Sequence, residues 1–171
     1  MQFDAMVFAG GGNRCYWQGG FIEAASEAMG GLPPVIVGAS AGAFAAAYSI
    51  LGIGAEVRAG VIETCRAAKG NVDWRAALSG RPAFPVGALY RDLMRFAFSP
   101  ERFEALKARA DLGIAIARPP VRLPLSLAIP LGIGLYQVEK KLFAPVHPSG
   151  GRKLGFTAHF AWARQLGAVE D

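Results

Sequence analysis

The order of secondary-structure signals in the N-terminal third of the chain constrains the fold more than any other feature. An apolar run at residues 3–9, ended by glycines, predicts a short buried strand, and apolar residues at helical spacing follow over 16–29. A second apolar run at 35–40 predicts another buried strand, and the alanine-rich segment 41–51 predicts a helix. Strand, helix, strand and helix in this order predict an α/β fold with a parallel sheet.

Clear helix and strand patterns continue along the chain as far as residue 117, and one more appears at its end. We expect helices over 54–69, 87–98 and 100–109, a strand over 111–117, and the start of a further helix in the last residues, 162–171. Ser99 and Pro100 supply the N-cap and the first-turn proline of the third of these helices.

An apolar stretch from Leu123 to Val138 is harder to interpret. It is shorter than the ~20 residues of a membrane-spanning helix, and Pro124 and Pro130 interrupt it. We predict a buried loop and a short helix here. A segment that rests on a lipid surface, with Arg122, Lys140 and Lys141 at its ends, is the open alternative.

Composition narrows the class of protein. The length of 171 residues fits a single domain, residues 1–171. With glycine counted and tyrosine left out, the apolar content is roughly 63% against an average near 45–50%, which predicts a membrane-facing surface or a surface that a missing piece of chain covers. The formal charge of +5 comes mostly from scattered arginines, which does not favour a nucleic-acid partner and leaves attraction to anionic lipid open. Without a signal peptide, Cys15 and Cys65 are expected to be free thiols of a cytoplasmic protein, and they lack metal-ligand spacing.

The second predicted strand ends in a pattern of small residues, "GASAG", from Gly38 to Gly42. In a nucleophile elbow a serine occupies a sharp turn between strand and helix, and the flanking glycines let neighbouring backbone pass closely. The predicted strand before Ser40 and the predicted helix after it fit this context. Ser40 is therefore the candidate nucleophile.

Attack by a serine on an ester carbonyl creates an oxyanion, which needs preorganised donors. The amide of Ala41 is one candidate, and the segment "GGGNR" after the first strand, with Gly11, Gly12, Asn13 and Arg14, supplies the others. The glycines do not match a dinucleotide fingerprint, because Cys15 occupies its last glycine position, and the lysine of a phosphate loop is absent.

Together, "FAGGGNRCYWQGGF" (8–21) and "VIVGASAGAFAAA" (35–47) resemble the patatin-like phospholipase family. The resemblance implies a three-layer α/β/α fold with a mainly parallel sheet and a lipid acyl hydrolase activity of the phospholipase or esterase type. It also implies a Ser–Asp dyad without metal or cofactor, acting on lipid or another acyl ester with peripheral membrane contact. By position, Ser40 is similar to the family's nucleophile, Gly11, Gly12 and Asn13 to its oxyanion loop, and Arg14 to its loop arginine. Cys15 departs from the family, which usually has glycine there.

The family's aspartate lies in an Asp-Gly motif after the serine, and this chain contains no Asp-Gly pair. Asp4 and Asp111 begin predicted strands, at the edge of the sheet opposite to that where catalytic groups collect. Asp73 is expected to cap a helix and Asp92 to lie on a helix surface. We therefore expect a truncated member that ends before its catalytic aspartate.

Two alternatives remain open at this point. One is a Ser–Asp–His hydrolase of another family that uses His147 or His159, although one strand before the serine is fewer than such enzymes usually have. The other is a non-catalytic fragment that binds lipid or a partner protein through exposed apolar surface.

Overall fold

The computed structural model describes residues 3–67, 79, 86–120, 122–143 and 150–166. The described elements are β1 (Ala5–Phe8), the short 3₁₀ helix η1 (Gly12–Cys15), α1 (Tyr16–Ala25), β2 (Val35–Ala39), α2 (Ala41–Leu51), α3 (Gly54–Ala67), α5 (Val86–Ala97), α6 (Pro100–Arg109), β3 (Asp111–Arg118), α7 (Leu125–Phe143), α8 (Gly150–Lys153), β4 (Thr157–Trp162) and the 3₁₀ turn η2 (Ala163–Gln165).

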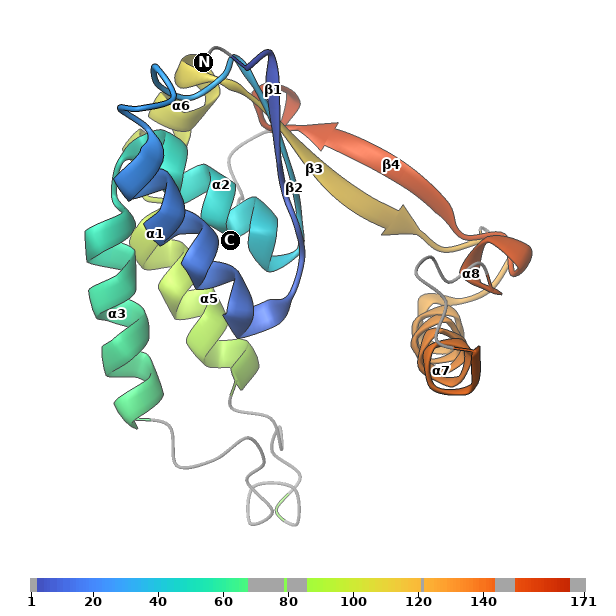
Figure 1. Cartoon of the computed structure of the whole chain (residues 1–171). Coiled ribbons are helices and arrows are strands. Elements are labelled where there is room, and N and C mark those ends of the chain that lie inside the picture. The colour runs from blue at the N-terminus through green and yellow to red at the C-terminus, as the bar shows by residue number, and fades with distance from the viewer. Residues whose placement is uncertain (1–2, 68–78, 80–85, 121, 144–149, 167–171) are drawn as a thin grey trace. The chain divides into compact units, whose positions relative to one another are not determined.

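The strands form a four-stranded sheet in the order β1-β2-β3-β4. β1 and β2 pair in parallel, with Ala5 opposite Val35 and Phe8 opposite Gly38, and the arrows of β3 and β4 point in opposite directions (Figure 1). The α/β class with a mainly parallel sheet flanked by helices is thereby confirmed. The parallel pairing brings the ends of β1 and β2 to the same edge of the sheet.

The chain divides into two compact parts, and each is described by itself. Residues up to Ile114, together with those from Trp162 onward, form what we call the sheet–helix part, and residues 115–161 form the α7 part. The helices of the sheet–helix part gather along one side of β1 and β2 (Figure 1). The side chains of a strand point alternately to the two faces of the sheet. Phe8 and Ile36 are buried on the face that the helices cover, whereas Val7, next to Phe8 in β1, points to the other face and is 75% exposed.

The core of the sheet–helix part is built around α2. Seven consecutive residues of this helix, Gly42 to Tyr48, are buried, and α2 packs against β2, α1 and α6. The ring of Phe44 makes edge-to-face contacts with Tyr48 and Phe98, with centroids 5.4 Å and 5.6 Å apart. A helix buried on all sides needs apolar residues all round, which explains its alanine-rich sequence.

Most of the elements agree with the sequence-based predictions. α2 has the predicted bounds, and the Ser99 hydroxyl caps α6 by accepting a hydrogen bond from the amide of Arg102. β4 was not expected. The segment 162–171, predicted as the start of a helix, instead contains the end of β4 and the turn η2, and residues 167–171 lie outside the described residues.

The prediction for residues 123–138 is wrong. Residues 125–138 belong to α7, a helix of 19 residues with exposed apolar side chains, where a buried loop and a short helix had been expected. Pro124 comes just before the first helical residue, where a backbone N–H would have no partner within the helix, so its absence costs nothing. Pro130 lies inside the helix, where it lacks the N–H that would donate to a carbonyl of the preceding turn.

Candidate active site

Ser40 joins β2 to α2 in a backbone conformation that side chains rarely adopt. Its φ is 52° and its ψ is −128°, and no other non-glycine residue in the described ranges has a positive φ. Such a conformation costs on the order of 1–3 kcal/mol and persists only where surrounding packing enforces it. The residue is exposed, and its carbonyl oxygen accepts a hydrogen bond from the amide of Ala43 at 2.9 Å. The turn therefore presents the Ser40 side chain to solvent at the amino end of a buried helix.

The two glycines that flank Ser40 are required by close backbone contacts. A Cβ atom at Gly38 would collide with the backbone of Ala43, and one at Gly42 would collide with the carbonyl oxygens of Phe8 and Ala9. The first contact lets the chain reverse from β2 into α2. The second lets the end of β1 lie against the first turn of α2. The Gly-x-Ser-x-Gly spacing thus has a steric cause on both sides of the serine.

The glycine loop after β1 lies beside this turn. A Cβ atom at Gly10 would be 3.6 Å from Cβ of Ser40 and 3.1 Å from the carbonyl oxygen of Ala39. Gly12 has a φ of 59°, in the left-handed region that favours glycine, and it begins η1, which leads directly into α1. The structure therefore brings the glycine loop and Ser40 together at the carboxyl ends of β1 and β2.

The remaining predicted residues of the loop lie around this point. Asn13 is part of η1, and Arg14 is exposed, with its Nε donating a long hydrogen bond of 3.5 Å to the carbonyl of Gly11. Ala41 is the first residue of α2. Cys15 points inward, because it is only 3% exposed and its Sγ donates to the carbonyl oxygen of Ala9 at 3.2 Å.

Gln18, which the sequence analysis did not single out, fixes the start of the loop. Its Nε2 donates to the carbonyl oxygen of Ala9 at 2.8 Å, and its Oε1 accepts from the amide of Ala9 at 3.0 Å. The side chain is 9% exposed. Both backbone groups of the residue that precedes the glycines are therefore satisfied by one amide from α1. The sequence offered one signal for this role, because Gln18 is a polar residue among the apolar residues of a predicted helix.

The three described aspartates lie where the sequence analysis expected them. The amide of Asp111 donates to the carbonyl of Pro34, before the first residue of β2, and its carboxylate pairs with Arg164 at 2.8 Å. Asp4 precedes β1, and Asp92 is exposed on α5. Within the described ranges, no carboxylate or imidazole is hydrogen-bonded to Ser40, and no cluster of acidic, histidine or cysteine residues could hold a metal ion.

The two histidines belong to the α7 part of the chain by sequence. His159 is exposed on β4. His147, like Asp73 and Asp171, falls outside the described residues. The alternative assignment of a histidine base therefore stays a hypothesis.

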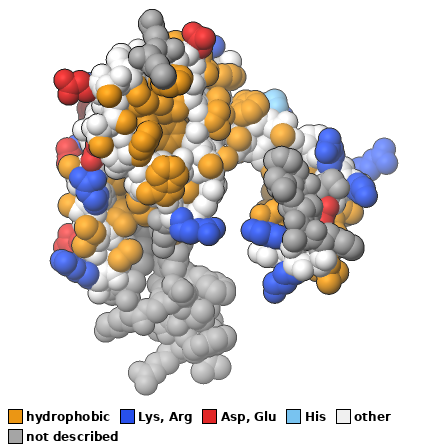
Figure 2. All heavy atoms as spheres, viewed as in Figure 1, with side chains coloured by type: hydrophobic (Ala, Val, Ile, Leu, Met, Phe, Trp, Pro, Cys, Tyr) orange, Lys and Arg blue, Asp and Glu red, His pale blue; other side chains and the backbone are white. Residues whose placement is uncertain are grey.

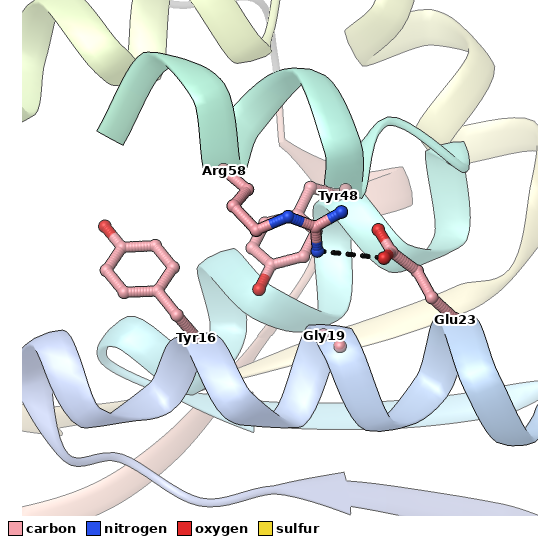
Figure 3. A pocket seen from close by; sticks show the side chains of 7 residues that line it. Tyr16, Gly19, Glu23, Tyr48 and Arg58 are labelled. Atoms are coloured by element: carbon pink, nitrogen blue, oxygen red, sulfur yellow. Dashed lines mark hydrogen bonds and ion pairs between the residues drawn. The ribbon is translucent and has the colours of Figure 1, made fainter. Parts of the chain in front are cut away.

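A small cavity between α1, α2 and α3 is lined by Tyr16, Gly19, Gly20, Glu23, Tyr48, Gly54 and Arg58 (Figure 3). Its volume of about 20 Å³ is room for one water molecule, and it does not fit an acyl chain. Burial, with smaller contributions from neighbouring groups, raises the pKa of Tyr16 to about 12 and that of Tyr48 above its usual value. Both hydroxyls are therefore neutral at pH 7, so neither supplies a base.

Comparison with known families agrees with this geometry. A sequence model of the patatin-like phospholipase family matches residues 6–161, which include most of β1, the glycine loop and the Ser40 turn. The chain therefore belongs to the patatin-like phospholipase family. No match was found among curated proteins or among solved structures. Among the described residues, no helix is both long enough and apolar enough to cross a membrane.

The contact at Gly42 leads to a prediction about stability. Gly42→Ala places a methyl group against the carbonyl oxygens of Phe8 and Ala9, so we expect a loss of about 3 kcal/mol in the free energy of unfolding. Gly20→Ala is the matched control, because nothing lies within 4 Å of a Cβ there and the residue is inside α1. It should stabilise the chain by up to about 1 kcal/mol. Urea unfolding followed by circular dichroism measures both, and equal stability of Gly42→Ala and the parent chain would refute the steric argument.

Replacement of Gln18 tests the hydrogen bonds to Ala9. Gln18→Leu leaves the amide of Ala9 without its partner and leaves the thiol of Cys15 as the remaining donor to its carbonyl, so we expect a loss of roughly 1–3 kcal/mol in the free energy of unfolding. Gln165→Leu, at an exposed glutamine of η2, should change stability by less than about 0.5 kcal/mol. The two variants are compared by urea unfolding, and similar small effects would show that the amide of Gln18 does not hold the loop.

Proposed function

We propose that this chain is a serine-dependent acyl hydrolase of the phospholipase or esterase type, with Ser40 as its nucleophile. One observation carries the proposal above all. Ser40 is the non-glycine residue held at positive φ in the described ranges, and it is exposed directly beside a loop of bare glycine backbone. Backbone strain of this kind concentrates at functional sites. Membership of the family supports lipid esters as the substrate class.

The proposed reaction begins with attack of the Ser40 hydroxyl oxygen on the ester carbonyl carbon. The hydroxyl proton passes to a general base, and the carbonyl oxygen becomes an oxyanion. The amides of Gly11, Gly12 and Ala41 are the proposed donors to this oxyanion, and the amino-terminal end of α2 adds a favourable dipole. Collapse of the tetrahedral intermediate breaks the bond to the leaving alcohol, which takes up a proton. Water then attacks the acyl-serine and releases the acid, which restores the hydroxyl.

Two other residues complete the proposed site. Asn13 and Arg14 extend the loop beyond the glycines, and the guanidinium of Arg14 is exposed near the carbonyl of Gly11. This positive charge is suited to the phosphate or carboxylate of an anionic lipid. Gly38 and Gly42 allow the close backbone contacts of the turn, because they have no side chains.

Labelling by a fluorophosphonate probe tests the nucleophile. The probe forms a covalent bond with an activated serine, and we expect a single adduct on the peptide that contains Ser40. Ser40→Ala should abolish the adduct, whereas Ser26→Ala, at the end of α1, should leave it unchanged. Mass spectrometry of the digested chain identifies the modified residue. An adduct that persists in Ser40→Ala would rule out the assignment.

The rate of ester turnover tests the general base. The chain contains no Asp-Gly pair, the motif that carries the base in the family it resembles. Loss of a catalytic base costs several orders of magnitude in rate, of the order of 10⁴. We therefore expect the 171-residue chain to hydrolyse p-nitrophenyl esters only slightly above background, with labelling of Ser40 slow but specific. Rapid turnover that disappears in Ser40→Ala would show that a base is present, and His159→Ala and His147→Ala would then locate it.

A further inference from the structure

Basic residues are scattered along the whole chain, but the net positive charge is concentrated in one segment. Residues 115–161 contain six lysines and arginines and one glutamate, whereas the other residues contain twelve lysines and arginines and twelve acidic residues. The formal charge of +5 therefore resides entirely in this segment. Uneven charge of this kind attracts an oppositely charged partner to one region of a protein.

Within the α7 part, one narrow stripe of α7 is packed. Ala128 is fully buried, Gly132 lies against the ring of Phe156, and Leu135 lies against Gly150. The Oε2 of Glu139 accepts a hydrogen bond from the amide of Gly150 at 2.7 Å. These four positions recur at helical spacing on one side of the helix. This stripe holds α7 to α8 and to the segment that follows it.

The rest of α7 exposes large apolar side chains. Eight of them are at least 44% exposed: Leu125, Leu127, Ile129, Leu131, Ile133, Tyr136, Val138 and Leu142. They form two rows along the helix, one on each side of the packed stripe. A helix that faced water in this way would normally carry polar residues at these positions. Exposed apolar surface of this extent marks a site of interaction.

Basic side chains surround this apolar surface. Lys140 and Lys141 lie in the last turns of α7, Arg122 precedes the helix, and Arg152 and Lys153 are on α8. All five are exposed. Figure 2 shows Lys and Arg side chains beside apolar ones on the α7 part. The combination of apolar rows and a basic border matches a bilayer surface, where acyl chains lie below anionic headgroups.

We propose that α7 binds the surface of anionic membranes, lying in the interface with the row of Leu125, Ile129, Ile133 and Tyr136 among the upper acyl chains and its basic residues on the headgroups. The helix does not meet the requirements for crossing a bilayer, which fits a surface position. A second copy of the chain would have to place like charges against each other, which disfavours self-association through this surface. The proposal does not depend on Ser40, because binding precedes any reaction.

Vesicle co-sedimentation of the full chain tests the proposal. At low salt we expect binding to vesicles of phosphatidylcholine with phosphatidylglycerol and much weaker binding to phosphatidylcholine alone. High salt should weaken the binding to anionic vesicles, because it screens exposed charges. Ser40→Ala should bind as the parent chain does, so loss of the hydrolase function and loss of binding are told apart. A sample spun without vesicles corrects for aggregated protein.

Two pairs of variants identify the surface. The double variant Lys140→Gln and Lys141→Gln should lower partitioning into anionic vesicles about 30-fold, whereas Arg66→Gln with Arg91→Gln, which removes the same charge from α3 and α5, should not. Ile129→Gln with Ile133→Gln should lower it at least about tenfold. Its control is Ile62→Gln with Met94→Gln, at similarly exposed apolar positions of the sheet–helix part. Circular dichroism checks the helix content of each variant.

Several results would overturn the proposal. One is that the parent chain does not bind anionic vesicles at low salt, or that it binds neutral vesicles equally well. Another is that the α7 variants and their controls lose vesicle binding to the same extent. Light scattering that shows self-association lost in the isoleucine variant, without vesicle binding by the parent, would make a second copy the occupant. If the isoleucine variant loses helix content, the lysine variant alone tests whether α7 binds the vesicles. Lys140 and Lys141 are exposed and make no packed contact in the stripe, so their replacement should leave the helix intact.

Discussion

The site depends on one close contact between backbones. The carboxyl end of β1 lies against the first turn of α2, with the carbonyl oxygens of Phe8 and Ala9 where a side chain of residue 42 would otherwise be. Because Gly42 has no Cβ, the glycine loop that follows Ala9 begins within reach of Ser40. Gln18 holds Ala9 from the other side through two hydrogen bonds. Two backbone segments, far apart along the chain, are thereby fixed next to each other.

The burial of α2 maintains the strained conformation of Ser40. A positive φ at serine is unfavourable by itself, and the turn would relax if α2 were free to shift. It is not free, because its residues from Gly42 to Tyr48 are buried among β2, α1 and α6. The apolar contacts of the helix thus offset the strain of the turn. A rigid support of this kind is what an exposed nucleophile requires in order to keep its orientation.

The chain separates two kinds of chemistry between its two parts. The sheet–helix part, with balanced charges, holds the strained serine and the glycine loop, and these support the proposed acyl transfer. The α7 part carries the whole formal charge and the exposed apolar rows, and these support the proposed attachment to anionic lipid. Among the described residues, eight of the 21 exposed large apolar side chains lie on α7.

Among the described residues, the sequence by itself determined the order of strands and helices up to residue 117, because the spacing of apolar residues and the turn residues are local signals. It also determined the Ser40 turn, since Gly38 and Gly42 are spaced so that neighbouring backbone can pack against them without a collision with a side chain. Only the tertiary structure decided the role of Gln18, which requires α1 to return to the end of β1. It also decided that α7 is exposed and that β4 pairs beside β3. Burial and strand pairing depend on partners distant in the sequence, and no local pattern of residues carries that information.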